Sequence, residues 1–335
     1  MTKIKIIFAF FGMTIFSMAT PVLAESFFEQ KAVTITVGLG VGGSYDLYSR
    51  LLARHMGAYI PGNPNFIVQN RPGAGGMLAF NQAARGPKDG TLITAVSQGL
   101  LLQEVIGAPG LDASLGNFNW IGNFTQENNV TVTWHTSSIK TISDAKLREV
   151  PLAASGAGST SAQIAELYNN LLGTKFRAIM GYESGAQQTL AMERGEMEGR
   201  ATNTWSSYKA SFPDARSRLN VLVQIGLRRE QELSDVPLLT ELVKDENEKT
   251  MVAQLVSECL AIARPFAAPP GTPEDRVAIL RLAFEQASRD PNLIEEASKL
   301  RLDLSPMSGA DVEKVIKGAI GSDPEIKKIV AKLFK

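Results

Sequence analysis

Three glycines between residues 38 and 43 have the spacing G-x-G-x-x-G and are the first residues in the chain that suggest chemistry. An apolar segment at 33–37 precedes them and a helical pattern at 45–56 follows, which is the context of a dinucleotide-binding turn. Such a turn also needs an acidic residue about 20 residues further on to bind the ribose. The stretch 47–88 contains no Asp or Glu, so we predict an anion site of another kind and no NAD.

A second loop of small residues, at 156–160 (Gly-Ala-Gly-Ser-Thr), follows a strand-like segment and precedes a helical pattern at 161–172. Unpaired backbone N–H groups and the helix dipole make the start of a helix favourable for an anion. Neither loop carries the Lys of a nucleotide-phosphate loop, so a small carboxylate suits both. Ser44, Ser159 and Thr160 stand where a hydroxyl either caps the helix or donates to the ligand.

Side chains that support catalysis or bind metals are scarce. His55 and His135 are the only histidines, and the sequence has no G-x-S-x-G, H-E-x-x-H or Cys/His cluster. We therefore predict no enzyme, no metal site and no cofactor. Asp46 lies in the first turn of the predicted helix, where it either stabilises the helix dipole or contacts the ligand. Cys259, the only cysteine, excludes an internal disulfide and indicates a small buried residue.

The N-terminus has the pattern of a secretory signal peptide. Two lysines at the start are followed by an apolar run at 6–19 and by Val22-Leu23-Ala24, a small-residue cleavage site. The run is shorter than the roughly 20 residues that span a bilayer, so we predict a signal peptide at 1–24 and a soluble, secreted chain. Without those two lysines, 32 basic residues face 34 acidic ones, which argues against a nucleic-acid partner.

The elements that position the two loops occur in the same order twice. Strand patterns lie at 33–37, 66–69 and 91–96, and again at 151–155, 176–180 and 197–204. Helical patterns follow the glycine-rich loops, and strands that alternate with helices predict a parallel sheet covered by helices. We therefore predict an α/β fold of two lobes, each a mainly parallel sheet flanked by helices, with a ligand cleft between them. Both loops lie at the carboxyl ends of strands, where ligands bind in such sheets.

Several further motifs resemble one family. They are Gly42-Gly43-Ser44-Tyr45-Asp46, the run from Gln69 to Gly76 (QNRPGAGG), Asp89-Gly90-Thr91-Leu92, the loop at 156–160 and the run from Ala268 to Pro273 (APPGTP). Together they resemble the Bug/TctC proteins, the extracytoplasmic binding components of tripartite tricarboxylate transporters. The resemblance implies a type II periplasmic binding protein, a Venus flytrap with a hinged cleft, that binds carboxylates largely through loop backbone and ordered water.

The resemblance also implies the residues that hold the ligand. One wall would comprise Gly43, Ser44, Asp46, Ala74, Gly75, Ser97 and Gln98, and the other Ser155, Gly156, Gly158, Ser159 and Thr160. Two regions depart from the family pattern. Tyr45 replaces a small residue, so the pocket is narrower or stacks an aromatic ligand. Around 200–205, Arg200 and Asn203 offer donors, while Trp205 is either a cleft wall or core.

We therefore predict a monomeric periplasmic receptor for a small aliphatic or aromatic mono- or dicarboxylate. It would deliver this ligand to the membrane permease subunits of a tripartite tricarboxylate-type transporter. A sensing receptor that hands the ligand to a signalling system is an alternative, and a secreted hydrolase is a weaker one. The first lobe would comprise 25–127 and 260–335, with all the C-terminal helices, and the second 128–259. The apolar run 260–263 reads as a buried parallel strand.

Overall fold

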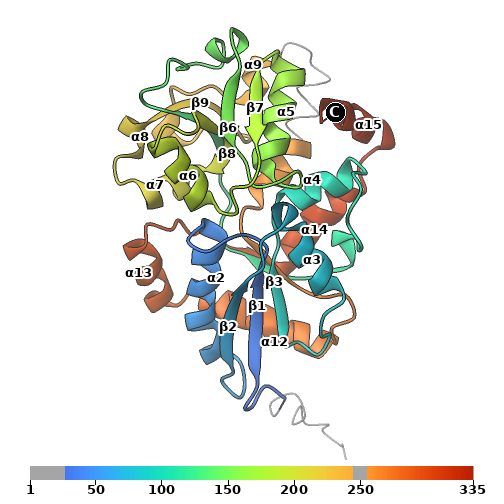
Figure 1. Cartoon of the computed structure of the whole chain (residues 1–335). Helices are drawn as coiled ribbons and strands as arrows, with labels where there is room; N and C mark the ends of the chain where they lie inside the picture. Colours follow the sequence, from blue (N-terminus) through green and yellow to red (C-terminus); the bar gives the residue numbers. More distant parts are fainter. Residues whose placement is uncertain (1–26, 244–254, 335) are drawn as a thin grey trace, which may run out of the picture.

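The computed structural model describes residues 27–243 and 255–334, which form two lobes, each built on one sheet (Figure 1). The predicted signal peptide lies outside the described residues. Within the described ranges, no helix is long and apolar enough to cross a membrane.

The first sheet contains both the N-terminal strands and strands from the end of the chain. In order across the sheet these are β11 (Met307–Ser308), β4 (Asn119–Asn123), β10 (Pro265–Ala268), β3 (Leu92–Ala95), β1 (Ala32–Val37) and β2 (Asn65–Asn70). β1 pairs in parallel with β2 and β3, whereas β10 is antiparallel to both of its neighbours. Val33, Ile35 and Val37 of β1 are fully buried, as expected for a strand covered on both faces.

The second sheet has the order β7 (Phe176–Ile179), β6 (Val150–Ala153), β8 (Gly199–Thr204), β5 (Asn129–Trp134) and β9 (Leu219–Ile225). β6 is parallel to β7 and β8, and β5 is antiparallel to β8 and β9. Its helices are α5 (Thr160–Leu172), α6 (Gly185–Glu193), α7 (Trp205–Ser211), α8 (Ala215–Arg218) and α9 (Leu239–Leu242). The predicted two-lobed α/β class is confirmed, with β5, β10 and β11 as reversed strands in otherwise parallel sheets.

The helices of the first lobe follow its glycine-rich loops. They are α2 (Ser44–His55), η1 (Met56–Tyr59), η2 (Ala74–Gly76), α3 (Met77–Ala84), α4 (Gly99–Val105) and η3 (Leu115–Asn117). In α2, Tyr48, Leu51 and Leu52 form the buried face, which is the helical spacing of the predicted apolar stripe.

The chain passes between the lobes twice, and the two passages run side by side. The first leads from β4 to β5, and the second from α11 (Ser257–Ala261) to β10. Gln126 and Ile262 form an isolated antiparallel bridge, and Ala263 N–H donates to Thr125 O over 3.2 Å. The prediction of a strand at 260–263 is wrong, because the run ends helix α11 and the strand begins only at Pro265. A short apolar run fits a buried helix as well as a buried strand.

The C-terminal helices pack on both lobes. α12 (Glu274–Ala287) and α14 (Gly309–Ile320) lie against β4, and α13 (Pro291–Lys299) lies against α2. α15 (Pro324–Leu333) lies against α5 of the second lobe (Figure 1). We expected all of them on the first lobe, so α15 is an exception.

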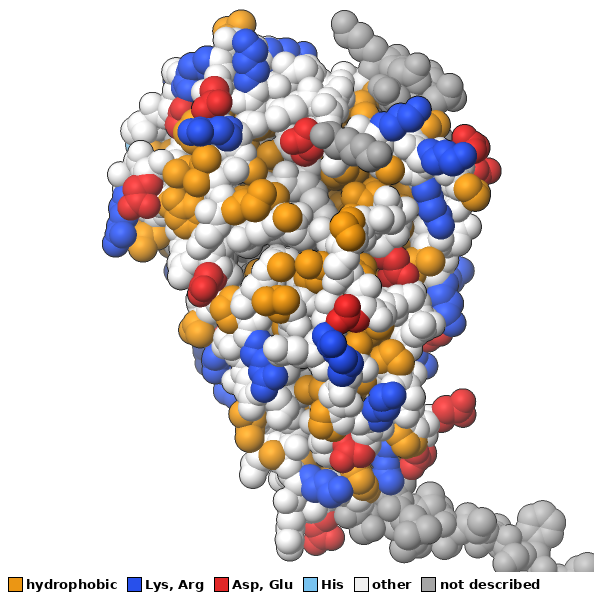
Figure 2. Space-filling model, turned by 45° about the vertical axis from the view of Figure 1, so that its right-hand side comes forward, with side chains coloured by type: hydrophobic (Ala, Val, Ile, Leu, Met, Phe, Trp, Pro, Cys, Tyr) orange, Lys and Arg blue, Asp and Glu red, His pale blue; other side chains and the backbone are white. Residues whose placement is uncertain are grey.

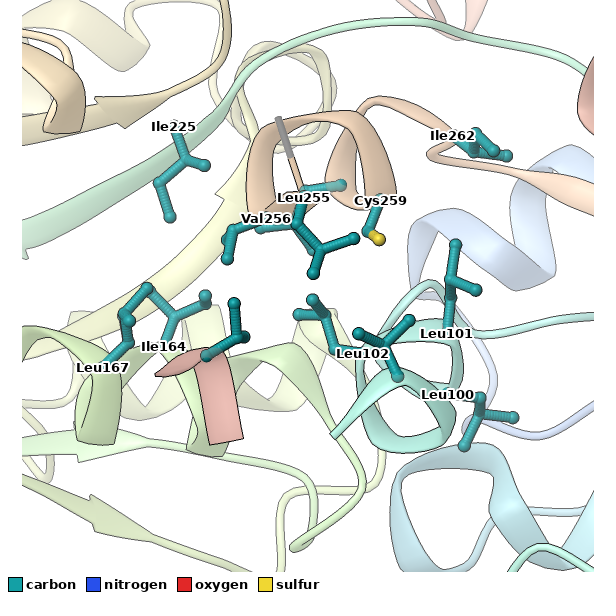
Figure 3. Close-up of a cluster of buried hydrophobic side chains, with 14 of the residues drawn as sticks. Leu100, Leu101, Leu102, Ile164, Leu167, Ile225, Leu255, Val256, Cys259 and Ile262 are labelled. Carbon is teal, nitrogen blue, oxygen red and sulfur yellow. The ribbon is translucent and has the colours of Figure 1, made fainter. Parts of the chain in front are cut away.

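An apolar cluster joins the lobes on one side of the cleft. Figure 3 shows Leu102 of α4 and Ile164 of α5 gathered around Val256 and Cys259, which belong to the α11 segment. Cys259 is fully buried, as predicted, and burial raises the pKa of its thiol. This cluster therefore packs residues of both lobes together.

Candidate ligand-binding site

A cavity of about 50 Å³ lies where the two sheets face each other. It is bounded by the ends of β1, β3 and β6, as expected for the ligand site of α/β sheets. Ten of the residues predicted for the site line it: Gly43, Ser44, Tyr45, Ser97, Gln98, Ser155, Ser159, Thr160, Arg200 and Asn203. Seven others complete the lining: Leu39, Asn129, Ser161, Gly185, Thr202, Thr204 and Arg264.

The hydroxyls of the second-lobe loop are held in a defined arrangement. The Ser159 hydroxyl donates to Gly156 O over 2.6 Å and lies 2.9 Å from the Ser161 hydroxyl. The Ser161 hydroxyl in turn accepts from Ser155 N–H. Ser159 is the N-cap residue of α5 but makes no side-chain cap, and Ser44 is the first residue of α2, after the N-cap Gly43. These hydroxyls therefore line the cavity within a fixed loop.

Ala74, Gly75, Gly156 and Gly158 do not line the cavity but bring the lobes together beside it. A Cβ on Gly75 would lie 2.4 Å from Ser159 N, and one on Gly158 would lie 2.6 Å from Ala74 O. Only glycine permits so close an approach of two backbones. We call this contact, Ala74 and Gly75 against Gly156, Gly158 and Ser159, the glycine rim.

Asp46 and Trp205 are also placed away from the cavity. The Asp46 carboxylate accepts from Gly42 N–H over 2.9 Å and pairs with Arg50 at 2.9 Å. Burial alone would raise the pKa of Asp46, but Arg50 and Gly42 N–H lower it below its usual value. Trp205 is buried in the second lobe and its Nε1 donates to Glu232 over 2.7 Å. Asp46 thus holds the first glycine loop, and Trp205 is core.

Arg264, which sequence reasoning missed, is fixed beside the cavity by several contacts. Its side chain is 2% exposed. Nη2 donates to the hydroxyls of Thr204 and Ser207 over 2.9 and 2.7 Å, and Nη1 donates to Ala263 O. The guanidinium also lies 4.8 Å from the ring centroid of Tyr45, which is a cation–π contact. In the sequence, Arg264 stands out as the single charged residue in the apolar run 259–268.

Tyr45 is a wall of the cavity, and its hydroxyl is already engaged. The hydroxyl accepts from Gln98 N–H over 3.0 Å. Burial raises the pKa of Tyr45, which stays a neutral phenol at physiological pH. One face of its ring lies against Arg264, and Tyr45 lines the cavity.

Arg200 differs from Arg264 because its guanidinium has few partners. It is 7% exposed and lies on β8, where Thr202 and Thr204 share its face by the two-residue period of a strand. Among the described residues, only Gly185 O accepts from it, over 3.4 Å, and Nε has no partner. Burial lowers the pKa of Arg200, and the charge of Arg264 adds to this effect. A buried cation in this state is a strong candidate for binding an anion.

Comparison with known proteins identifies the family of this chain. Residues 50–331 match the model of the family described as tripartite tricarboxylate transporter family receptor, TctC. The chain belongs to this family. TctC proteins are solute-binding receptors rather than enzymes, so the prediction of no enzyme is confirmed.

A curated relative and two solved structures agree with this assignment. A protein of Cupriavidus necator known as UPF0065 protein in gbd 5'region is 26% identical over 285 residues, which is 82% of this chain and 80% of that protein. The periplasmic binding protein BugD is 18% identical, with a TM-score of 0.72 over 91% of this chain and 98% of BugD. MatC from Rhodopseudomonas palustris, solved with bound malate, has the same identity and TM-score over 91% of this chain and 100% of MatC. These likenesses confirm the fold.

Proposed function

We propose that this TctC receptor binds a small carboxylate in the cavity between its lobes, in the periplasm, and delivers it to the membrane subunits of a tripartite tricarboxylate transporter. The observation that carries the proposal is the buried guanidinium of Arg200, whose Nε has no partner, at a cavity whose described lining contains no Asp or Glu. A buried charge without a partner costs several kcal/mol. A carboxylate ligand offsets that cost and forms charge-assisted hydrogen bonds.

The arrangement of the loops supports capture by closure. Gly40 N–H of the first lobe donates to Glu183 O of the second over 2.8 Å, and the glycine rim touches on another side of the cavity. In the proposed mechanism, the two passages near 124–128 and 262–264 act as the hinge. A ligand that contacts both walls favours the closed state by those contacts. The malate bound by MatC supports a carboxylate as the ligand.

The surface is compatible with a receptor that works as a monomer. On the face drawn in Figure 2, basic and acidic side chains are interspersed over both lobes. This matches the equal numbers of basic and acidic residues in the chain. The field at the surface is therefore weak, and we assign the selection of an anion to the buried arginines.

The test is a thermal-shift and calorimetric screen of residues 25–335, which include all but the first 24 residues. The panel would contain aliphatic and aromatic mono-, di- and tricarboxylates, amino acids and NAD. A ligand at 100 times its dissociation constant raises the free energy of unfolding by about 2.7 kcal/mol. We expect at least one acid to bind with a stoichiometry near one. Failure of every acid to bind a protein shown to be free of ligand would overturn the proposed function.

A further inference from the structure

The charge balance around the cavity singles out Arg200 as the group that meets a ligand. Glu127 is a buried carboxylate near Arg264. Burial raises its pKa above the usual value, and the charge of Arg264 offsets part of this effect. Glu127 accepts from Ser206 N–H, from the Ser206 hydroxyl and from the Thr125 hydroxyl, over 3.0, 2.7 and 2.9 Å. Three donors of this kind favour the ionised form. Arg264 and Glu127 belong to one hydrogen-bond network, because Arg264 donates to the Thr204 hydroxyl, which lies 3.3 Å from the Ser206 hydroxyl that donates to Glu127. The Arg264 charge is therefore already engaged by protein groups.

Arg200 has no such partner. No ion pair of Arg200 is found among the described residues. Its guanidinium lies 5.9 Å from the ring centroid of Tyr208, and Tyr208 and Arg264 are the titratable groups that act on it. Its Nε–H has no partner among the described residues, and a guanidinium can bind a carboxylate through Nε and Nη2 in two parallel hydrogen bonds. The cavity thus carries one unmatched positive charge, which calls for one carboxylate.

Gln98 adds a requirement for a hydrogen-bond donor. Asn129 Nδ2 donates to Leu260 O over 3.1 Å, which fixes the orientation of that amide. Asn129 Oδ1 therefore accepts from Gln98 Nε2 over 3.1 Å and from the Thr202 hydroxyl over 2.9 Å. Gln98 is 6% exposed and its Oε1 has no partner among the described residues. An unpaired buried acceptor costs about 1–3 kcal/mol, which a hydroxyl on the ligand would recover.

The rest of the lining agrees with a ligand that carries hydroxyls. Most of its side chains end in a hydroxyl or an amide, and Leu39 and the ring of Tyr45 supply the apolar contact. The cavity is small, about 50 Å³, which favours a short ligand.

We propose, on the basis of the proposed carboxylate-receptor function, that the ligand is a short hydroxylated monocarboxylate. Its carboxylate binds the Nε and Nη2 edge of Arg200, and one of its hydroxyls donates to Gln98 Oε1. Alkyl acids without a hydroxyl have no group that can donate to Gln98 Oε1. Dicarboxylates bring a second negative charge, and the described lining of the cavity holds no second cation that is free to bind it.

Four acids of equal chain length test the two parts of this proposal separately. They are threonate, butyrate, tartrate and succinate, which combine one or two carboxylates with the presence or absence of hydroxyls. Calorimetry on residues 25–335 is expected to show threonate binding at least tenfold more tightly than each of the others. Equal affinity for butyrate and threonate would overturn the role of the hydroxyl. Tighter binding of tartrate or succinate would overturn the charge count.

Other results of the wider screen separate this inference from the proposed function. If some other acid binds while none of these four does, the inference fails and the carboxylate receptor stands. If no acid of any kind binds, the proposed function fails as well.

Two variants then test the residues. Gln98→Met is expected to reduce the ratio of threonate to butyrate affinity about tenfold, since a hydrogen bond of about 1.4 kcal/mol corresponds to that factor. Glu127→Gln leaves Arg264 unmatched, so it is expected to raise tartrate affinity relative to threonate. Thermal unfolding checks that both variants fold. An unchanged ratio in folded Gln98→Met, or in folded Glu127→Gln, would contradict the assignment of that residue.

Discussion

The glycine rim and the cavity beside it divide the work of the cleft. The rim is built from motif glycines whose backbones touch across the lobes, with no room for a Cβ at Gly75 or Gly158. The cavity holds its charge on Arg200 and Arg264, which belong to none of the recognised motifs. The motif glycines thus lie where the lobes approach most closely, whereas both charged side chains of the cavity come from outside the motifs.

The two arginines at the cavity differ in the partners of their guanidinium groups. Arg264 is committed to protein partners and supports the structure, whereas Arg200 is free to bind a ligand.

The largest effect is expected on stability, from Arg264→Met. This change leaves Glu127 buried without its cation and removes the donors to Thr204 and Ser207. Breaking a buried charge pair costs about 3–5 kcal/mol, which urea unfolding would measure. The matched variant Arg200→Met is expected to change the free energy of unfolding by less than about 1 kcal/mol, because its guanidinium has no strong partner to lose. Equal losses in the two variants would remove the distinction between them.

For ligand affinity, in contrast to stability, we expect the large effect at Arg200. Arg200→Gln removes the charge opposite the ligand carboxylate and is expected to weaken binding by about 2–5 kcal/mol, at least thirtyfold. Arg85→Gln is the control, since Arg85 is an exposed arginine that pairs with Asp112 on the surface. Calorimetry with the best acid of the screen measures both. Affinity within threefold of the wild type in Arg200→Gln would exclude Arg200 from the site.

The glycine rim should affect affinity without affecting the fold of either lobe. Gly158 does not need a positive φ, but a Cβ there meets Ala74 O across the rim. Gly158→Ala is therefore expected to hold the cleft open and to weaken binding about tenfold if closure becomes tenfold rarer. Small-angle scattering would show a smaller ligand-induced compaction than in the wild type. Gly318→Ala is the control, because a Cβ at Gly318 meets nothing within 4 Å. It should leave affinity and compaction unchanged. If Gly158→Ala leaves them unchanged too, the glycine rim does not control closure.

The smallest effect concerns Asp46, which holds the first glycine loop and does not line the cavity. Asp46→Asn is expected to lower the free energy of unfolding at pH 7 by about 1 kcal/mol. Because the pKa of Asp46 is lowered in the folded protein, this stabilisation is present above the unfolded pKa of about 3.9 and is lost as pH falls through the folded pKa. Urea unfolding at pH 7 and near pH 3 should show the gap between wild type and variant closing, and a constant gap would contradict this role.

Much of the fold could be predicted because the apolar periodicity was strong and the loops were punctuated by glycine. The helix predicted at 161–172 differs from α5 by one residue, and so does the strand predicted at 33–37 from β1. The run 260–263 could not be assigned, since its apolar residues are buried on all sides and no periodicity separates helix from strand there. The contact of α15 with α5 depends on tertiary packing that local patterns do not encode.

The part of the candidate site that lies in or next to recognised motifs could be predicted from the sequence, and the rest could not. Ser97, Gln98 and the loop 155–160 follow strands, so their position at the cleft could be inferred. Thr202 and Thr204 alternate with Arg200 along β8, a period-two pattern that could have identified this wall. Arg264 lies in the passage that returns to the first lobe, and only the three-dimensional path of the chain brings it to Tyr45.

The most direct measurement is a crystal structure of residues 25–335 with the strongest-binding acid of the screen. The account predicts a carboxylate between the lobes, with its two oxygens about 2.7–2.9 Å from Nε and Nη2 of Arg200. A carboxylate bound elsewhere, with the Arg200 guanidinium still without an anionic partner in the closed cleft, would contradict the central claim.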